Sequence, residues 1–257
     1  MRFYSVMLCG LFAVLGAGMC GCVVDRTSLS NGGEVSAGGV GGDSDEAMMA
    51  DWENAFSGLQ ESGEFEEPGP LVLIEAERVY RVVDSGGEVA TIRVEQVDDA
   101  EYPYRRYTAD NRIEHLRLGG DASVLIGRVE DLGHNQTTTY DPPVPLLPGA
   151  IRVGEPLVVE SSMVVRPSGN PDAVTTRGTC VVTISLVGVE RVNVGGESLE
   201  AHRILTAYEA KMGMASVTQS TTSWWVTGWG LAAEQSAERI GALIFNSTTE
   251  RKMIAAE

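Results

Sequence analysis

TTRGTCVVTISLVGVERVNV, residues 175–194, is followed by the glycine pair 195–196 and then by SLEAHRILTAYEAK, residues 198–211. Valine, threonine and isoleucine dominate the first stretch. Its apolar residues recur at every second position, as in a strand with one buried face. Two such stretches joined by Gly-Gly predict an antiparallel hairpin.

The same strand pattern continues through residues 68–257. Short turns separate the stretches, among them Gly86-Gly87, 167–172 and Met212-Gly213, and no long segment has the helical period of 3.6 residues. The pattern predicts one all-β domain of about ten antiparallel strands. A domain of this size buries enough surface to fold without disulfide bonds.

Residues 1–21 have the layout of a secretory signal peptide. Arg2 precedes an apolar run that ends near Met19, with small residues close to its end. The run is short and glycine-rich for a membrane span, which needs about 20 apolar residues. We therefore expect an exported protein from which this segment is removed.

Cys22 is the residue that we expect to carry a lipid. Met19-Cys20-Gly21-Cys22 resembles the lipobox of bacterial lipoproteins, in which a small residue precedes the acylated cysteine. The resemblance implies an anchor in a bacterial membrane, and we favour the outer membrane, facing the periplasm, over the inner one. The alternative is an ordinary secreted protein whose cysteines near the cleavage site are incidental.

Residues 22–67 form an acidic linker rich in glycine and serine. From residue 23 to 67 it holds eleven acidic residues and one basic residue, a formal charge of −10, which favours an extended, flexible chain. A short helix is predicted over 46–59, where four apolar residues share one helical face. In one interpretation it docks on the chain's own domain or stays unbound, and in the other it folds on a partner's groove. The four are Met48, Trp52, Phe56 and Leu59.

The stretch SWWVTGWGLAAEQ, residues 223–235, holds three of the four tryptophans, Trp224, Trp225 and Trp229. Alternation places Trp224 and Trp225 on opposite faces of a strand, and the glycines around Trp229 predict a bulge or tight turn. The rings either pack where a sheet bends or line a mouth through which an acyl chain, sugar or apolar peptide enters.

Three segments resemble families of bacterial exported proteins. They are PLLPGAIRVGE (145–155), GVERVNVGGESLEAHRI (188–204) and WWVTGWGLAAE (224–234). These families are similar to the half-barrel superfamily of the periplasmic lipoprotein carriers. The resemblance implies an unclosed β-barrel, a curved antiparallel sheet around an apolar concave face.

Patterns that indicate catalysis or cofactor binding do not occur in the sequence. The histidines at 115, 134 and 202 have no metal-ligand spacing, and we expect His115 and His202 to be solvated. Cys180 shares a strand face with apolar residues, so we expect it in the core. A net charge of −17 argues against a nucleic-acid partner. We expect no catalytic residue, metal or cofactor.

Two functions are compatible with these observations. The first is a non-catalytic binding module that holds an apolar ligand, a lipid or acyl chain, in the concave face of a half-barrel near Trp224, Trp225 and Trp229. The second is a structural or protein-interaction module of the cell envelope with a plugged core. Whether the inner face is open or filled distinguishes the two.

Overall fold

A computed structural model describes residues 52, 54–61, 64–66, 76–83, 88–108, 111–242 and 245–256. The predicted signal peptide, Cys22 and the greater part of the predicted linker lie outside these residues. No helix in the described part of the chain is long and apolar enough to span a membrane.

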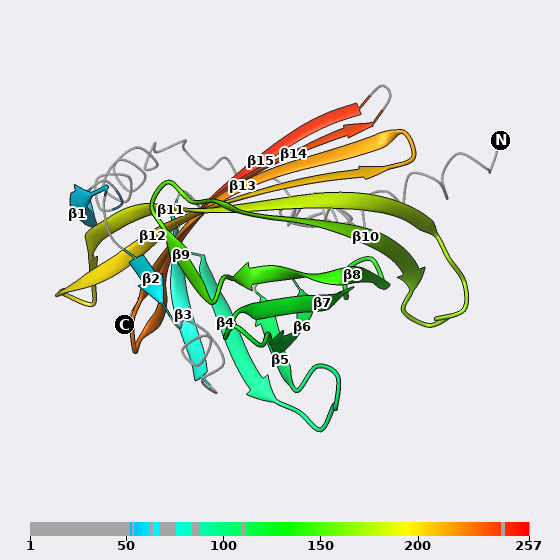
Figure 1. Ribbon diagram of the computed structural model, residues 1–257, viewed down its shortest axis with the longest axis horizontal. Helices are drawn as coiled ribbons and strands as arrows, with labels where there is room; N and C mark the ends of the chain where they lie inside the picture. Colours follow the sequence, from blue (N-terminus) through cyan, green and yellow to red (C-terminus); the bar gives the residue numbers. More distant parts are fainter. Residues whose placement is uncertain are drawn as a thin grey trace, which may run out of the picture.

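The described residues form fifteen β-strands (Figure 1). In chain order they are β1 (Phe56–Gln60), β2 (Glu64–Glu66), β3 (Ala76–Val83), β4 (Val89–Gln96), β5 (Tyr104–Thr108), β6 (Arg112–Leu118), β7 (Val124–Asp131), β8 (Gln136–Leu147), β9 (Ala150–Arg152), β10 (Leu157–Pro167), β11 (Thr176–Val194), β12 (Glu197–Met212), β13 (Ala215–Val226), β14 (Gly230–Ala242) and β15 (Phe245–Ala255).

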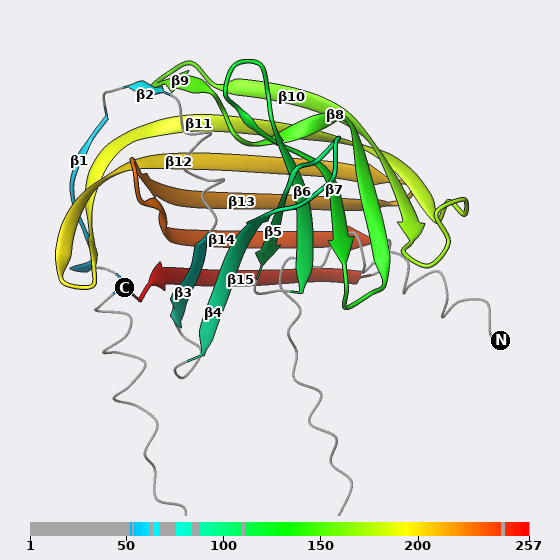
Figure 2. The same cartoon turned by 90° about the horizontal axis from the view of Figure 1, so that it is seen from below.

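Twelve of these strands close into an antiparallel barrel, in the order β11-β10-β8-β7-β6-β5-β4-β3-β15-β14-β13-β12 and back to β11. Figure 2 shows β10 to β15 running along the length of the molecule while the shorter β3 to β7 cross them. The all-β prediction is confirmed, but the predicted unclosed barrel of about ten strands is wrong.

One pairing between strands far apart in the sequence closes the ring. The last strand joins the first barrel strand, from Lys252 opposite Val83 to Ala255 opposite Tyr80. Strand β11 pairs with β12 along one edge and with β10 along the other. Closure gives the backbone groups of the end strands partners that an open sheet would leave free.

The hairpin expected from the glycine pair 195–196 is present, and β11 and β12 pair from Val194 opposite Glu197 to Thr179 opposite Lys211, with one register shift between Leu186 and Gly188. Both glycines have positive φ, as do Gly213, between β12 and β13, and Gly228, between β13 and β14. Such tight turns set the register of the long strands, which in turn decides which side chains face inward.

Strand β8 contains three prolines in its second half. β8 pairs with β10 only from Gln136 to Asp141. The prolines 142, 143 and 145 follow this ladder, where their missing N–H groups cost no bond to β10. Beyond Asp141 the two strands separate and leave a seam in the barrel wall.

Strand β1 extends the wall beyond the end of β10. Phe56 pairs with Val192 and Gln60 with Val189 along the edge of β11 that β10 leaves free. The described fold therefore begins before residue 68. Phe56 and Leu59 lie in a strand, so the predicted helix does not extend through them, because the free edge of β11 supplies hydrogen bonds to an extended chain.

Candidate ligand-binding lumen

The inner faces of β12 to β15 carry polar side chains in register. Thr206 lies opposite Thr221, Thr221 opposite Ser236, and Ser236 opposite Arg251, one residue from each strand. Side chains alternate along a strand, so residues two positions away form neighbouring rows on the same face. One such row is Tyr208, Gln219 and Glu238, and another is Ile204, Ser223, Glu234 and Met253.

The opposite wall contributes a buried ion pair. Arg106 on β5 and Glu114 on β6 form two hydrogen bonds, Nε to Oε2 at 2.7 Å and a terminal nitrogen to Oε1 at 3.2 Å. Burial works against the charge of Arg106, but the neighbouring Glu114 carboxylate outweighs it and raises the pKa of Arg106. The pair therefore keeps two charges inside the barrel.

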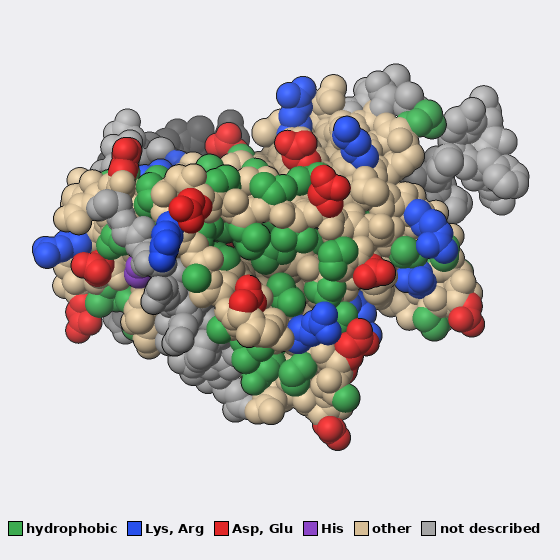
Figure 3. Space-filling model, viewed as in Figure 1, with side chains coloured by type: hydrophobic (Ala, Val, Ile, Leu, Met, Phe, Trp, Pro, Cys, Tyr) green, Lys and Arg blue, Asp and Glu red, His purple; other side chains and the backbone are tan. Residues whose placement is uncertain are grey.

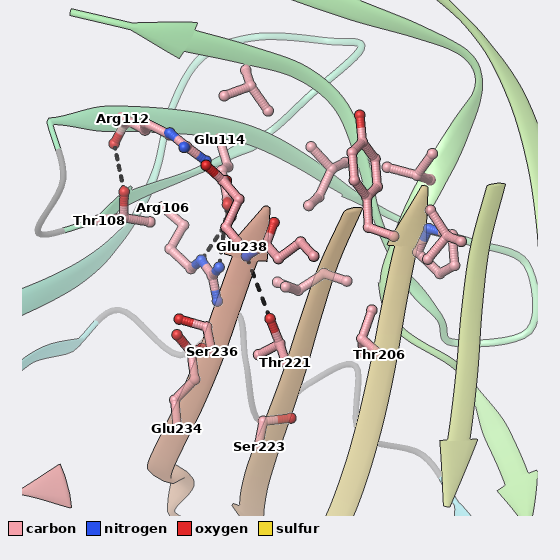
Figure 4. Close-up of a pocket in the computed structure, with 18 of the residues that line it drawn as sticks. Arg106, Thr108, Arg112, Glu114, Thr206, Thr221, Ser223, Glu234, Ser236 and Glu238 are labelled. Carbon is pink, nitrogen blue, oxygen red and sulfur yellow. Dashed lines mark hydrogen bonds and ion pairs between the residues drawn. The ribbon is translucent and has the colours of Figure 1, made fainter. Parts of the chain in front are cut away.

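Together these faces line a cavity of about 220 Å³. In Figure 4, Arg106 and Glu114 lie across from Thr221, Ser236 and Glu234. Apolar side chains complete the lining, and charged, hydroxyl and amide groups alternate with them. The lumen is therefore neither a plugged apolar core nor a purely apolar groove.

One part of the cavity is lined by tyrosines. The Tyr208 hydroxyl donates a hydrogen bond to Met163 Sδ at 3.4 Å. Burial raises the pKa of Tyr140 to about 12 and that of Tyr208 well above its usual range. Cys180 is buried, as predicted, and burial raises its pKa to about 11. The thiol is thus protonated near neutral pH and is not activated as a nucleophile.

The tryptophans take three different positions. Trp225 lines the cavity and donates from Nε1 to Ser223 Oγ at 2.9 Å. Trp224 points to the opposite face of β13 and donates to the buried Glu190 carboxylate. Trp229 is half-buried, and the Arg78 guanidinium carbon lies 4.0 Å from its ring centre. The structure thus brings only Trp225 into the cavity lining.

Trp224 is covered by the segment that contains Trp52 and Phe56. Trp52 contacts its ring edge-on, with 5.7 Å between ring centres, and Trp52 and Phe56 contact each other. The Asn193 N–H donates to the Ala55 carbonyl oxygen at 2.8 Å, which fixes the segment on β11. Of the two alternatives for the apolar patch, the described residues show docking on the chain's own domain.

The cavity reaches the seam between β8 and β10. Val144, Pro145 and Leu146 line it, and all three follow the last β8 residue that pairs with β10. Ser161 Oγ donates to the Pro142 carbonyl oxygen at 2.6 Å, where the two strands begin to separate. The seam is the part of the wall in which β8 and β10 share no ladder.

His115 is buried on the outer face of β6, and the expectation of a solvated side chain is wrong. Arg128 lies 2.7 Å from Nδ1 and Glu130 Oε1 lies 2.7 Å from Nε2. Arginine can only donate, so Nδ1 accepts and Nε2 carries the proton given to Glu130. Burial lowers the pKa of His115, and the charge of Arg128 lowers it further.

Sequence patterns missed Arg106, Glu114 and Arg251 as lumen residues. A signal for the wall formed by β12 to β15 was present in residues 216–223, SVTQSTTS, which apart from Val217 are polar on both strand faces. A strand with one face in an apolar core alternates apolar and polar residues instead. Within the described residues, no cluster of three or more His, Cys, Asp or Glu side chains could hold a metal ion.

Comparisons with known proteins give distant likenesses. No family model and no curated protein sequence matches the chain. The hypothetical lipoprotein YmcC from Escherichia coli aligns with 74% of this chain and 94% of its own at 11% identity and a TM-score of 0.37. A protein from Parabacteroides distasonis described as a candidate lipoprotein aligns with 73% and 96% at 9% identity and a TM-score of 0.36. These TM-scores are too low to support a conclusion about function.

Proposed function

We propose that this protein is an exported, lipid-anchored and non-catalytic binding protein that holds a small polar molecule inside its barrel. The observation that carries the proposal is the set of charged and hydroxyl side chains that face the lumen among apolar ones. Arg106 and Glu114 face it from one wall, and the row from Thr206 to Arg251 faces it from the other.

The lining favours a polar ligand over the acyl chain expected from the sequence. A hydrocarbon chain against Arg251, Ser236 and Thr221 would remove water from polar groups without replacing its hydrogen bonds, which is unfavourable. A molecule with hydroxyl, amide or charged groups can supply those bonds. The apolar residues of the lining and the Trp225 indole suit the carbon skeleton of such a molecule.

The cavity also argues against a fully plugged core. A volume of about 220 Å³ exceeds that of the few water-sized voids of a close-packed interior. It is small for a drug-sized ligand, whose sites span roughly 300–1,000 Å³. We therefore expect a ligand with about a dozen non-hydrogen atoms or fewer.

Anchoring and export rest on the sequence of the first 22 residues. The lipobox-like Gly21-Cys22 supports acylation at Cys22, and we favour the outer membrane as its location. A net charge of −17 supports a partner other than nucleic acid. On the face seen in Figure 3, charged side chains of both signs are scattered and form no broad basic patch.

The test uses the full chain with Cys22→Ala, exported and purified without detergent. Native mass spectrometry would reveal a retained small molecule. Calorimetry would measure the binding of neutral sugars, amino acids and small acids and compare it with the binding of a C12 fatty acid. Binding of a small polar molecule supports the proposal. Binding of the fatty acid alone would restore the acyl-chain hypothesis, and no binding of any kind would contradict both.

The anchor is tested separately by cell fractionation. Wild-type protein is expected in the outer-membrane fraction and the Cys22→Ala form in the soluble periplasmic fraction. A Cys20→Ala variant is the matched control, because Cys20 belongs to the predicted signal peptide. Membrane association of the Cys22→Ala form would refute lipid attachment at this residue.

A further inference from the structure

Arg251 has a weaker acceptor than Arg106, one of the two arginines that line the cavity on the opposite wall. Arg106 forms a bidentate pair with Glu114. Among the described residues, the hydrogen bond that Arg251 forms goes to Met253 Sδ at 3.3 Å. A thioether is a weak acceptor, and a guanidinium has five N–H groups to donate. Within the described residues, most of the hydrogen-bonding capacity of Arg251 is therefore not used.

Hydroxyl groups line the same row as Arg251. Ser236 lies directly opposite it on β14, Thr221 is next on β13, and Thr206 follows on β12. Neighbouring strands are about 4.8 Å apart, so Ser236 is within reach of any group that contacts the guanidinium. The row thus combines one cation with hydroxyl donors on a single face.

The charges in the neighbouring rows define the polarity of the site. Glu238 and Glu234 lie two residues away from Ser236 along β14, one on each side. An anion therefore finds its favourable place at the Arg251 end of the row, and hydroxyl or amino groups of the same molecule can contact the flanking carboxylates. An oxyanion and a guanidinium form charge-assisted hydrogen bonds, which are stronger than neutral ones.

From these observations we infer that the ligand of the lumen carries an oxyanion, a carboxylate, phosphate or sulfate, which binds to Arg251 and Ser236, with Thr221 beside them. The inference rests on the proposed function, since it names the chemical class of the polar ligand. A neutral ligand could offer hydroxyl or carbonyl oxygens to the guanidinium, but these hydrogen bonds would lack the charge assistance that an oxyanion provides.

The experiment measures binding of acetate, inorganic phosphate and sulfate to the full-length Cys22→Ala protein by calorimetry and NMR at constant ionic strength. Arg251→Gln is the test variant, and Arg239→Gln, at an exposed position on β14, is its matched control. We expect Arg251→Gln to weaken the preferred oxyanion roughly 10- to 100-fold, and Arg239→Gln to leave it unchanged. Arg251→Lys should retain part of the affinity because it keeps the charge.

The outcomes separate this inference from the proposed function. The inference is supported if an oxyanion binds and if Arg251→Gln and Ser236→Ala weaken its binding while both variants unfold thermally like the wild type. The preferred anion then distinguishes a carboxylate from a phosphate or sulfate ligand. Equal binding to Arg251→Gln and wild type overturns it. Binding of neutral sugars without any oxyanion overturns it while the polar-ligand function stands. Binding of fatty acid alone overturns both.

Discussion

Phe56 stacks on Trp224 with 4.3 Å between ring centres and 28° between ring planes, although the two residues belong to opposite ends of the fold. Phe56 lies on β1, in a segment that the sequence assigns to the linker, and Trp224 lies near the end of β13. Trp52 completes the cluster on the outer face of the barrel. The segment expected to be a tether therefore forms part of the wall.

This cluster should hold β1 on the barrel. Phe56→Ala is expected to lower the free energy of unfolding by about 2–4 kcal/mol, because it removes a large ring and its stacking contact. Leu59→Ala, at an exposed position on the same strand, should change it by less than about 0.5 kcal/mol. Denaturant unfolding measures both, and hydrogen exchange at residues 189–194 should rise in Phe56→Ala alone. Similar costs for the two variants would show that the stack does not anchor β1.

Removing one partner of the buried Arg106–Glu114 pair should lower the free energy of unfolding strongly, whereas replacing both residues with apolar ones should lower it much less. Glu114→Gln is expected to destabilise the protein by roughly 3–5 kcal/mol, because the Arg106 charge stays buried without its carboxylate. A double variant with Arg106→Met and Glu114→Leu removes both charges and should lose much less stability. Chemical denaturation of Arg106→Met, Glu114→Leu and the double variant completes a double-mutant cycle that measures the coupling. Additive effects of the two single changes would contradict a direct pair.

Trp229 is expected to stabilise the barrel without contributing to binding. Its ring packs under Arg78 and is not part of the cavity lining. Trp229→Ala should cost about 1–2 kcal/mol through the lost cation–π and packing contacts. It should leave ligand retention in the lumen unchanged, whereas Trp225→Ala should alter retention. If Trp229→Ala has normal stability but loses its ligand, this prediction is wrong and Trp229 lies at the entrance of the lumen.

Stability should fall on mild acidification because of His115. Its pKa is lowered in the folded state from an ordinary value of 6.5, so the unfolded chain binds the proton more readily. The stabilising contribution is complete above about pH 6.5 and is lost as the pH falls from there toward the folded-state pKa. Thermal unfolding between pH 7.5 and 5 measures this loss.

His115→Gln is the variant that checks the assignment, since glutamine keeps one donor and one acceptor but does not titrate in this range. Its unfolding should show a weaker dependence on pH over the same interval. His134→Gln is the control, because His134 is more exposed and bonds to Asp131 within a turn. An unchanged pH dependence in His115→Gln would assign the effect to another group.

Periodicity predicted the strands better than their assembly. The hairpin around the glycine pair 195–196 and the burial of Cys180 follow from alternation and turn chemistry within short segments. Closure depends on the pairing of β15 with β3, whose residues are more than 160 positions apart. No local sequence pattern in either strand indicates that it pairs with the other. The resemblance to half-barrel proteins favoured an open sheet, and no local feature opposed it.

The candidate site was the harder part to predict. A strand pattern shows which residues share a face, but a lumen and a core look alike until the opposite wall is known. Trp225 was a predicted site residue and does line the cavity, whereas Trp224 and Trp229 pack elsewhere. Arg251 was not predicted as a site residue because nothing near it in the sequence distinguishes it from a surface arginine.

The sequence alone determined the strand content, the tight glycine turns and the signal-like N-terminal segment, because each depends on residues that are neighbours in the chain. Only the tertiary structure decided that the sheet closes, that β1 completes its wall, and that Arg251 faces Ser236 inside. These features arise from contacts between distant segments. Their free energy depends on which side chains meet across the barrel and on how much water they exclude.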